Sequence, residues 1–323
     1  MFRYVIRRIL WAFVLFFAVT IVTYIIFFVI PADPARAFAG KTATPEQIKR
    51  ARHYLGIDKP VPVQYARFVW RLTYHHSLGR SFSNREPVNK LVLTAAPVTA
   101  SLVLGGAVVW LMIALPLGIL SALRPRSLLD RTSMVFVLIG VSAHPIWIGL
   151  ILSYFIGFQW HLTPIAGYCD FFNPSVGADC GGPTQWTYHM ILPWMTFAML
   201  YAALYVRMIR ANVMEAMHED YVRTARAKGA REPRVMRVHV LRNALLPVVT
   251  ILGMDIGVAL GGAIFTESIY GLPGLGRISI QALNNLDLPT VMGVVVFATV
   301  MIIMFNLVVD ILYAWIDPRI RLG

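Results

Sequence analysis

Six long apolar runs, separated by polar segments, account for most of this chain. A helix needs roughly 20 apolar residues to cross the hydrocarbon core of a bilayer, and each run is about that long. The pattern therefore predicts an all-α integral membrane protein with six transmembrane helices. The runs are Ile9–Ile30, Val98–Leu123, Ser133–Phe158, His189–Val206, Leu245–Phe265 and Thr290–Tyr313.

The composition supports this interpretation. Hydrophobic residues make up 58% of the 323 residues and charged residues only 14%, whereas soluble domains carry about 25% charged residues. The net charge of +13 is by itself compatible with nucleic-acid binding. However, Lys and Arg gather at the ends of the apolar runs, which membrane topology explains better.

The distribution of Lys and Arg predicts that both termini lie in the cytoplasm. Nine of these residues fall between positions 207 and 242, between the fourth and fifth runs, and cytoplasmic loops carry such an excess. The first outer segment, 31–90, holds eleven, but a loop of about 60 residues crosses largely regardless of charge. The first run is longer than a signal-peptide core and no cleavage motif follows it, so we expect an uncleaved helix.

The first outer segment contains helix signals of its own. Thr44 is a predicted N-cap, and Pro45 follows it at the first helical position. Gly56 is predicted to end this helix. A second helix is indicated by apolar residues at i, i+3, i+4 and i+7, namely Tyr65, Phe68, Val69 and Leu72. We expect a small helical lobe on the outer membrane surface, which either covers the mouth of the bundle or docks an external partner.

The two cysteines, Cys169 and Cys180, both fall in the second outer loop. Nearby thiols on the oxidising side of a membrane are good disulfide candidates. Two free thiols remain the alternative. A metal site is poorly supported, because two cysteines supply too few ligands.

The basic segment 220–249 has the pattern of a helix–turn–helix. Val213, Met217, Tyr221 and Ala225 form one stripe, Gly229 breaks the helix, and Pro233 is placed to start another. Two interpretations are open: a solvated loop near anionic headgroups, or a surface shaped to receive a partner.

The sequence of that segment, DYVRTARAKGAREPRVMRVHVLRNALLPVV, resembles the cytoplasmic coupling loop of ABC-transporter permeases of the bacterial dipeptide and oligopeptide group. In that family the loop docks into a cleft of an ATPase subunit. The general motif's proline is absent, since Arg242 stands at its place, and Pro247 replaces it further on. The resemblance assigns ATPase coupling to Asp220, Tyr221, Arg223, Thr224, Ala225, Lys228 and Gly229.

Other blocks of the chain resemble the same family. They are MFRYVIRRIL at the start, IPADP, LGIDKPVPVQYARFVW, PLGILSALRPRSLLDR, TESIYGLPGLGR and DPRIR near the end. One departure is His76-Ser77, where the family commonly has Gly-Asp, and it leaves the turn of the outer lobe less certain. The resemblance divides the chain into residues 1–30 (cytoplasmic N-terminus and first helix), 31–96 (outer lobe), 97–314 (permease core, with the coupling loop at 207–243) and 315–323 (cytoplasmic tail).

The resemblance implies a multi-pass permease of the inner membrane that imports di- or oligopeptides. Its partners would be a second, similar permease chain, two ATP-binding subunits and an extracytoplasmic peptide-binding protein. ATP and Mg²⁺ would belong to the ATPase subunits, and this chain would hold no cofactor or metal. Related permeases carry nickel chelates, glutathione or haem, so these cargoes stay open.

No catalytic constellation is evident, so we expect a protein that is not an enzyme. The glycine-rich GLPGLGR lacks the G-K-[ST] ending of a phosphate-binding loop, and neither H-E-x-x-H nor G-x-S-x-G occurs. An intramembrane enzyme is disfavoured on this ground. A stand-alone channel or secondary carrier is the other alternative, and it would work without ATP.

The fifth run carries both a packing face and a charge. Gly253, Gly257 and Gly261 repeat every four residues, which allows a neighbouring helix to approach closely. Asp255 lies about 200° around the helix from this face. An ionised carboxylate near the bilayer centre costs at least about 2.5–3.5 kcal/mol, so such groups usually face a wet cavity.

We therefore expect Asp255 to line the translocation path and meet the ammonium group of a peptide. A hydrogen bond to a neighbouring helix, or a protonated carboxyl, is the alternative. Glu267 is a candidate gate or lobe contact, otherwise a residue at headgroup level. Asp310 is expected to pair with an arginine rather than to touch substrate.

Overall fold

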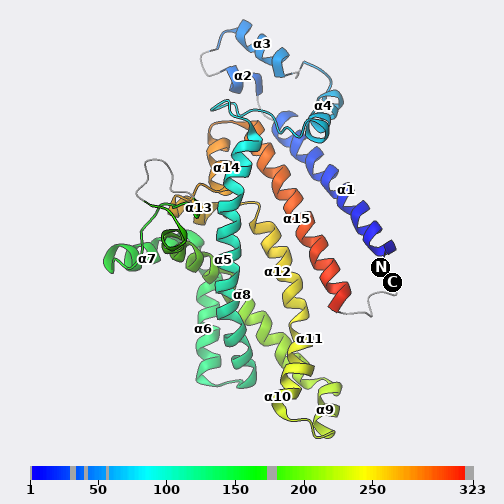
Figure 1. The fold of residues 1–323 in the computed structure, drawn as a ribbon, viewed down its shortest axis with the longest axis vertical. Helices are drawn as coiled ribbons and strands as arrows, with labels where there is room; N and C mark the ends of the chain where they lie inside the picture. Colours follow the sequence, from blue (N-terminus) through cyan, green and yellow to red (C-terminus); the bar gives the residue numbers. More distant parts are fainter. Residues whose placement is uncertain (1, 30–33, 40–42, 56–57, 173–179, 317–323) are drawn as a thin grey trace. The chain divides into compact units, whose positions relative to one another are not determined.

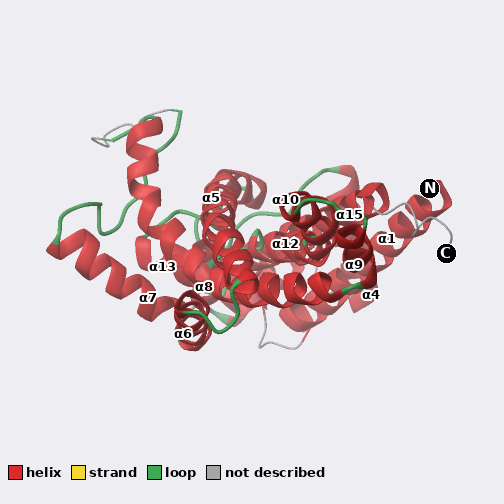
Figure 2. Cartoon of the chain, turned by 90° about the horizontal axis from the view of Figure 1, so that it is seen from below, coloured by secondary structure: helices red, strands yellow, loops and turns green. Residues whose placement is uncertain are grey.

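The computed structural model describes residues 2–29, 34–39, 43–55, 58–172 and 180–316. Figure 2 shows that these residues form helices joined by loops, and no strand occurs among them apart from one isolated bridge between Arg80 and Pro87. The predicted all-α class is therefore confirmed. The chain forms two compact units: residues 1–100, 257–267 and 273–307, and residues 101–256, 268–272 and 308–323.

The first unit holds the N-terminal helices and the outer lobe (Figure 1). α1 (Phe2–Tyr24) continues into a π-helical turn, Ile25–Val29, and is followed by the short α2 (Pro34–Ala39). Both helices expected in the lobe are present as α3 (Pro45–Leu55) and α4 (Val61–Tyr74). The stop expected at Gly56 lies outside the described residues.

The start of α3 is closed by a reciprocal pair of hydrogen bonds. The Thr44 hydroxyl accepts from the Gln47 N–H at 3.4 Å, and the Gln47 side chain accepts from the Thr44 N–H at 2.9 Å. This is the capping box that a Thr-x-x-Gln sequence encodes.

The rest of the first unit comes from distant parts of the sequence. It includes the start of α5 (Val88–Leu123), the start of α13 (Ile264–Tyr270), α14 (Leu275–Asn284) and most of α15 (Leu288–Ile316). One buried cluster joins Tyr24, Phe68, Met292 and Val296. The Asp287 carboxylate joins the lobe to the start of α15, because it accepts from the Phe82 N–H at 2.8 Å and from the Ser81 and Thr290 hydroxyls.

The second unit is built around the 36-residue helix α8 (Pro183–His218). Trp110 of α5 is fully buried and stacks on Tyr201 of α8, with ring centroids 4.7 Å apart. α6 (Leu128–Ser142) packs closely along α8. Gly140 allows this close approach because it has no side chain: a Cβ there would lie only 2.6 Å from the Ala203 Cβ. The remaining elements are α7 (Pro145–Leu152), a π-helical turn (Ser153–Gln159), α9 (Asp220–Ala227), α10 (Glu232–Arg234), the π-helical η3 (Val235–Leu241), α11 (Arg242–Ala244) and α12 (Leu246–Ala259).

Four described helices are long and apolar enough to cross a membrane: Ile6–Phe27, Val88–Leu123, Pro183–His218 and Leu288–Val309. Two bent pairs raise the number to six if each pair is one span. They are Leu128–Ser142 with Pro145–Gln159, bent by 109°, and Glu232–Ala244 with Leu246–Ala259, bent by 42°.

The third predicted span is therefore not one continuous helix from Ser133 to Phe158. Helix α6 ends at Ser142, and His144 caps a new helix by accepting from the Ile146 N–H at 3.3 Å. Pro145 then occupies the first turn, where its missing N–H does no harm. The fifth span is also shorter than predicted: α12 ends at Ala259, before Gly262 adopts a φ of +134°.

Candidate functional site

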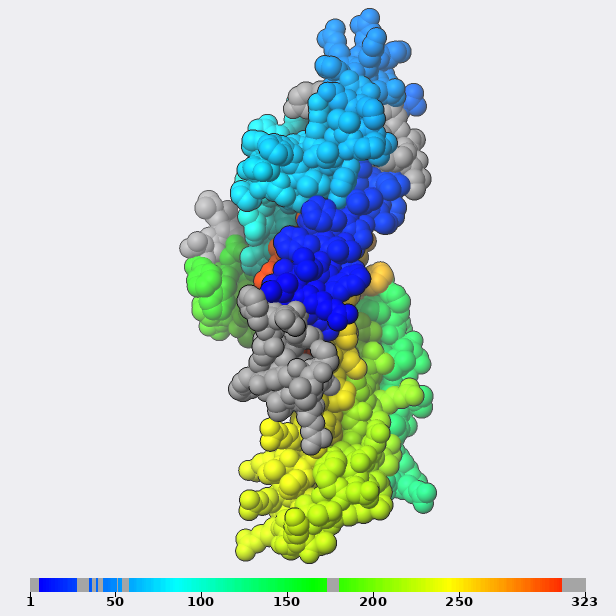
Figure 3. Space-filling view, turned by 90° about the vertical axis from the view of Figure 1, so that its right-hand side faces the viewer, coloured from blue at the N-terminus to red at the C-terminus, as the bar shows by residue number. Residues whose placement is uncertain are grey.

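The basic segment forms a short helix that follows the end of α8. The chain leaves the helical conformation at Glu219, whose ψ is 147°, and α9 begins at Asp220. Gly229 ends the turn after α9 with a φ of +78°, a left-handed conformation that favours glycine. Pro233 lies in the first turn of α10, as its position in the sequence predicted. Figure 3 shows this segment, in yellow-green and yellow, exposed on the molecular surface.

Helix α9 is held by Val222 and Ala225, which are both buried. The predicted stripe is only partly correct: Val213 and Ala225 are buried, but the Tyr221 side chain is 39% exposed. The prediction of this stripe assumed that one continuous helix runs from Val213 to Ala225. Because the chain breaks at Glu219, the register shifts and Val222 takes the inward position.

The side of α9 that lies opposite Val222 and Ala225 is exposed. Tyr221, Arg223, Thr224 and Lys228 are exposed, as are Asp220 and Gly229 at its two ends. Arg226 closes the turn around Gly229 by donating to Glu232 at 2.7 and 3.4 Å. A Cβ at Gly229 would meet nothing within 4 Å, so this chain leaves space beside the turn.

A groove of about 740 Å³ borders the start of α9. The last turns of α8, the π-helical η3, α11 and the start of α12 form its walls. Polar and charged residues along it include Asn212, Glu215, Glu219, His239, Arg242 and Asn243. Asn212 fixes one wall by donating to the Ala244 carbonyl at 3.2 Å.

An ion pair anchors α8 nearly three turns before α9. Arg210 donates to the two carboxylate oxygens of Asp130 at 2.6 and 3.0 Å. Asp130 is buried, and it also accepts from the Arg126 N–H at 2.9 Å and from the Ser121 hydroxyl. The carboxylate thus ties the turn between α5 and α6 to α8, and a bidentate Arg–carboxylate pair fixes both position and orientation.

Asp255 of α12 is half-buried and accepts from the Tyr205 hydroxyl of α8 at 2.7 Å. Tyr205 in turn lies against Trp110, with ring centroids 5.7 Å apart. The hydrogen bond to a neighbouring helix is thus present, while part of the Asp255 residue remains accessible.

The three glycines of the fifth run all face α15. In the second unit, a side chain at Gly253 would overlap Val309. In the first unit, a Cβ at Gly257 would lie 3.3 Å from the Ile302 Cα, and one at Gly261 would lie 2.9 Å from the Ala298 Cβ. Small residues at this spacing let the two backbones approach.

Glu267 is fully buried in the first unit. It accepts from the Thr99 hydroxyl at 2.7 Å and from the Arg277 N–H at 3.0 Å, at the start of α14. Burial raises the pKa of the Glu267 carboxyl, and these hydrogen bonds oppose the rise. Glu267 therefore stabilises the GLPGLGR turn by accepting from its last residue, Arg277, and the depth of Glu267 in the membrane stays a prediction. The side chain of Asp310 lies outside the described part of the chain.

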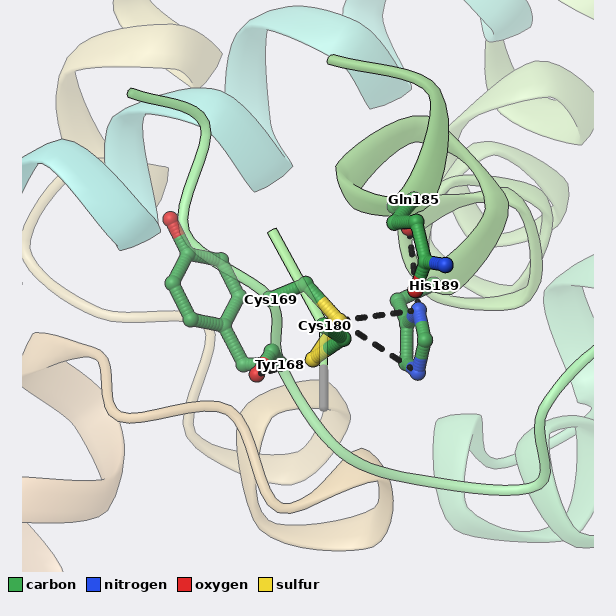
Figure 4. The surroundings of a disulfide bond; sticks show 5 residues. All are labelled: Tyr168, Cys169, Cys180, Gln185 and His189. Atoms are coloured by element: carbon green, nitrogen blue, oxygen red, sulfur yellow. Dashed lines mark hydrogen bonds between the residues drawn. A yellow bond between two sulfur atoms is a disulfide. The ribbon is translucent and has the colours of Figure 1, made fainter. Parts of the chain in front are cut away.

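Cys169 and Cys180 form a disulfide, as Figure 4 shows. The His189 ring lies beside Cys169, with Nδ1 3.3 Å from its sulfur, and Nδ1 is also 2.9 Å from the Gln185 carbonyl. Cys169, Cys180 and His189 lie close enough together to hold a metal ion, but the disulfide leaves no thiolate to act as a ligand.

Family models match almost the whole chain. The model described as "Binding-protein-dependent transport system inner membrane component" matches residues 114–322, and the model of the N-terminal part of such components matches residues 1–103. The chain belongs to this family. It is therefore a multi-pass inner-membrane transport component, and the basic segment 220–249 lies within the matched residues 114–322.

Curated relatives of this inner-membrane component match it over nearly their full length. The dipeptide transport system permease protein DppB of Escherichia coli (strain K12) is 36% identical over 99% of both chains. The probable D,D-dipeptide transport system permease protein DdpB of the same organism is 36% identical over 99% of this chain and 98% of its own. A putative peptide transport system permease protein of Brucella abortus (strain 2308) is 35% identical over 98% of both.

Two solved structures share the fold of this component. An amino acid ABC transporter superposes with a TM-score of 0.53 at 15% identity, covering 70% of this chain and 94% of that one. The inward-facing MetNI methionine ABC transporter gives a TM-score of 0.51 at 18% identity, covering 70% of this chain and 96% of that one. At these identities the likeness concerns the fold alone.

Sequence reasoning missed the Asp130–Arg210 pair. The available signal was that Asp130 is the one acid in LRPRSLLDR, a segment that also holds three arginines. Its partner lies 80 residues further on, so only the packing of α6 on α8 reveals the pairing.

Proposed function

We propose that this chain is a transmembrane permease subunit of an ATP-driven importer that moves di- and oligopeptides from a binding protein into the cytoplasm. The similarity to peptide permeases over 98–99% of the chain carries the proposal. The TESIYGLPGLGR and RTARAKG blocks lie within this match.

The proposed topology has six spans with both termini in the cytoplasm. It counts each bent helix pair as one span, giving the six that the apolar runs predict. The charge distribution supports this orientation, because the basic segment between α8 and α12 is then cytoplasmic.

In this topology α9 is the coupling helix. Its exposed face, formed by Tyr221, Arg223, Thr224 and Lys228, is available to an ATPase subunit, while Val222 and Ala225 fix it to its own chain. The groove beside α9 offers room for a side chain of the partner. ATP and Mg²⁺ would be held by two ATPase subunits, and a second permease chain would complete the path.

The coupling step follows from the way α9 is attached. A partner that contacts α9 differently in two states can shift the permease between them by that difference in contact energy. The Asp130–Arg210 pair lies nearly three turns before α9 and holds α8 against the α5–α6 turn. We infer that this pair transmits a displacement of α9 to several helices at once.

Asp255 remains a candidate for the translocation path. Its carboxylate accepts from Tyr205 but is only half-buried, so an oxygen is left for the ammonium group of a peptide. Glu267 is fully buried and is not proposed as a substrate contact; its proposed role is to hold the turn before α14.

The test is uptake by the complete assembly in proteoliposomes, with ATP inside and the binding protein outside. A labelled dipeptide should enter only with ATP, and excess unlabelled dipeptide should compete. Competition by a nickel chelate, glutathione or haem in place of dipeptide would overturn the peptide assignment. Uptake that persists without ATP would indicate a channel or secondary carrier.

A further inference from the structure

Helix α4 has apolar residues on two opposite sides, and only one side is covered. Tyr65, Phe68, Val69 and Leu72 pack into the first unit. Val63, Trp70 and Tyr74, with Arg67, follow one another at intervals of four and three residues, which places them on a common face. Val63 is 40% exposed, Trp70 55% and Tyr74 67%, and Trp70 stacks on Tyr74 with ring centroids 3.8 Å apart.

The covered side of α4 contacts the outermost turns of two membrane spans. Tyr65 shares a 2.9 Å hydrogen bond with Thr20, and Gln64 accepts from Tyr24 at 3.1 Å. The span of α1 ends at Phe27, so these contacts lie about 5 and 10 Å inside its end. An interfacial helix is buried to about this depth.

The contacts with α15 indicate the same depth. Met292 and Val296 lie in the first turns of the span that begins at Leu288, and both belong to the cluster around Phe68. Helix α4 therefore flanks the ends of α1 and α15 instead of lying above them, and Figure 1 shows it near the corresponding ends of both helices. Its uncovered face then points sideways, at the level where headgroups meet acyl chains.

The chemistry of the uncovered face matches that level. Trp and Tyr are enriched at membrane–water interfaces, since each has an apolar ring and a polar group. Arg67 can extend its guanidinium toward lipid phosphate while its methylenes stay against the apolar face. The segment 31–90 holds eleven Lys and Arg against four acids, which favours anionic headgroups.

A lipid surface explains these observations better than a protein partner. Helix α1 exposes large apolar side chains along its length, among them Leu10, Val22 and Ile26. Such a surface on a membrane span faces acyl chains. Helix α4 lies beside the end of this span, and its exposed face holds Trp, Tyr and Arg in addition to an aliphatic residue.

We propose that α4 is an interfacial anchor, which binds phospholipid headgroups through Trp70, Tyr74 and Arg67 and fixes the lobe against the membrane. In the topology proposed above this is the outer leaflet. The inference itself needs only the membrane location of the chain, so it can fail or hold independently of the transported cargo.

The test is the depth of spin labels in the full assembly, reconstituted in vesicles of zwitterionic and anionic phospholipid. Cys169 and Cys180 are joined, so a label can be directed to an introduced cysteine, in the variants Val63→Cys and Tyr74→Cys. Leu10→Cys, in the middle of α1, serves as the hydrocarbon reference and Glu46→Cys, exposed on α3, as the water reference. Relative collision with oxygen and with a water-soluble nickel chelate gives the depth.

Labels at positions 63 and 74 should lie between the two references, with several-fold lower collision with the nickel chelate than at position 46. The extra substitution Arg67→Glu should raise that collision in anionic vesicles. Values at positions 63 and 74 equal to the water reference would overturn the proposal. So would protection that appears only when the binding protein is added, because the face would then dock a protein.

Discussion

At the scale of single residues, Asp255 poses the clearest question, because its hydrogen bond and its accessibility point to different roles. Asp255→Asn removes the charge but keeps the size, whereas Tyr205→Phe removes only the donor. If the charge meets the ammonium group of a peptide, Asp255→Asn should reduce uptake at least tenfold, and Tyr205→Phe should leave most of it. Initial uptake rates over several dipeptides measure both effects.

The thermal stability of the assembly serves as the control for these two variants. Equal losses of uptake and of stability in both would assign the pair a structural role. Asp255→Asn transport at a near-normal rate and substrate range would remove Asp255 from the path.

The disulfide makes a separate prediction at this scale. It closes a loop with a sequence separation of 11, and cross-links of this size stabilise by about 2–3 kcal/mol through the unfolded chain. The double variant Cys169→Ser/Cys180→Ser should inactivate at a lower temperature than the parent. A reducing agent should lower the inactivation temperature of the parent to that of the variant and leave the variant's own temperature unchanged. A parent whose inactivation temperature stays the same after its disulfide is reduced would contradict this.

At the scale of elements, the local signals in the sequence were strong where a cap or a glycine decides the structure. Thr44 and Gln47 encode the start of α3, and Gly229 and Pro233 encode the turn after α9. Two predictions failed because they assumed continuous helices. The break at Glu219 carries no glycine or proline, and the break before Pro145 lies within a run that is apolar on both sides.

The Asp130–Arg210 pair is tested by exchanging its charges. Removing one partner of a buried pair costs about 3–5 kcal/mol, and the Asp130 side chain is only 7% exposed. Asp130→Asn should therefore lower thermal stability and the amount of peptide moved per ATP. The double variant Asp130→Arg/Arg210→Asp should be more stable than Asp130→Arg alone and should move more peptide per ATP. Uptake and melting temperature of the parent, the two single variants and the double variant measure this.

The matched control for that cycle is Arg223→Asp, an exposed change on α9 that leaves the pair intact. It should keep the melting temperature while it weakens contact with the ATPase subunit. If neither single variant loses uptake or melting temperature, and the double variant gains neither, the pair does not position α8.

At the scale of the whole molecule, topology follows from charge counts but requires direct measurement. A cysteine introduced at Glu46 should react with a membrane-impermeant thiol reagent in intact cells, whereas one at Lys228 should react only after permeabilisation. The reason is that the basic segment is cytoplasmic when both termini are inside. Reaction of both positions in intact cells would contradict the proposed orientation.

Long-range polar contacts were beyond what the sequence could predict. Glu267 lies in a motif with an obvious glycine-rich turn, yet its partner Thr99 is 168 residues earlier. Asp287 binds residues 81 and 82 across a separation of more than 200 residues. Periodicity reports which face of a helix is apolar, but not which distant segment meets a buried carboxylate.

The central claim is that α9 couples ATP hydrolysis elsewhere to transport through this chain, and Gly229 offers its most direct test. Gly229→Asn tolerates the left-handed φ of +78°, whereas Gly229→Val costs about 1–2 kcal/mol there. Neither side chain starts with a clash, since a Cβ would meet nothing within 4 Å of this chain. The measurement is dipeptide uptake and ATP hydrolysis in the same proteoliposomes. We predict that Gly229→Val hydrolyses ATP with little uptake while Gly229→Asn stays close to the parent, and an unchanged ratio of peptide to ATP in Gly229→Val would contradict the account.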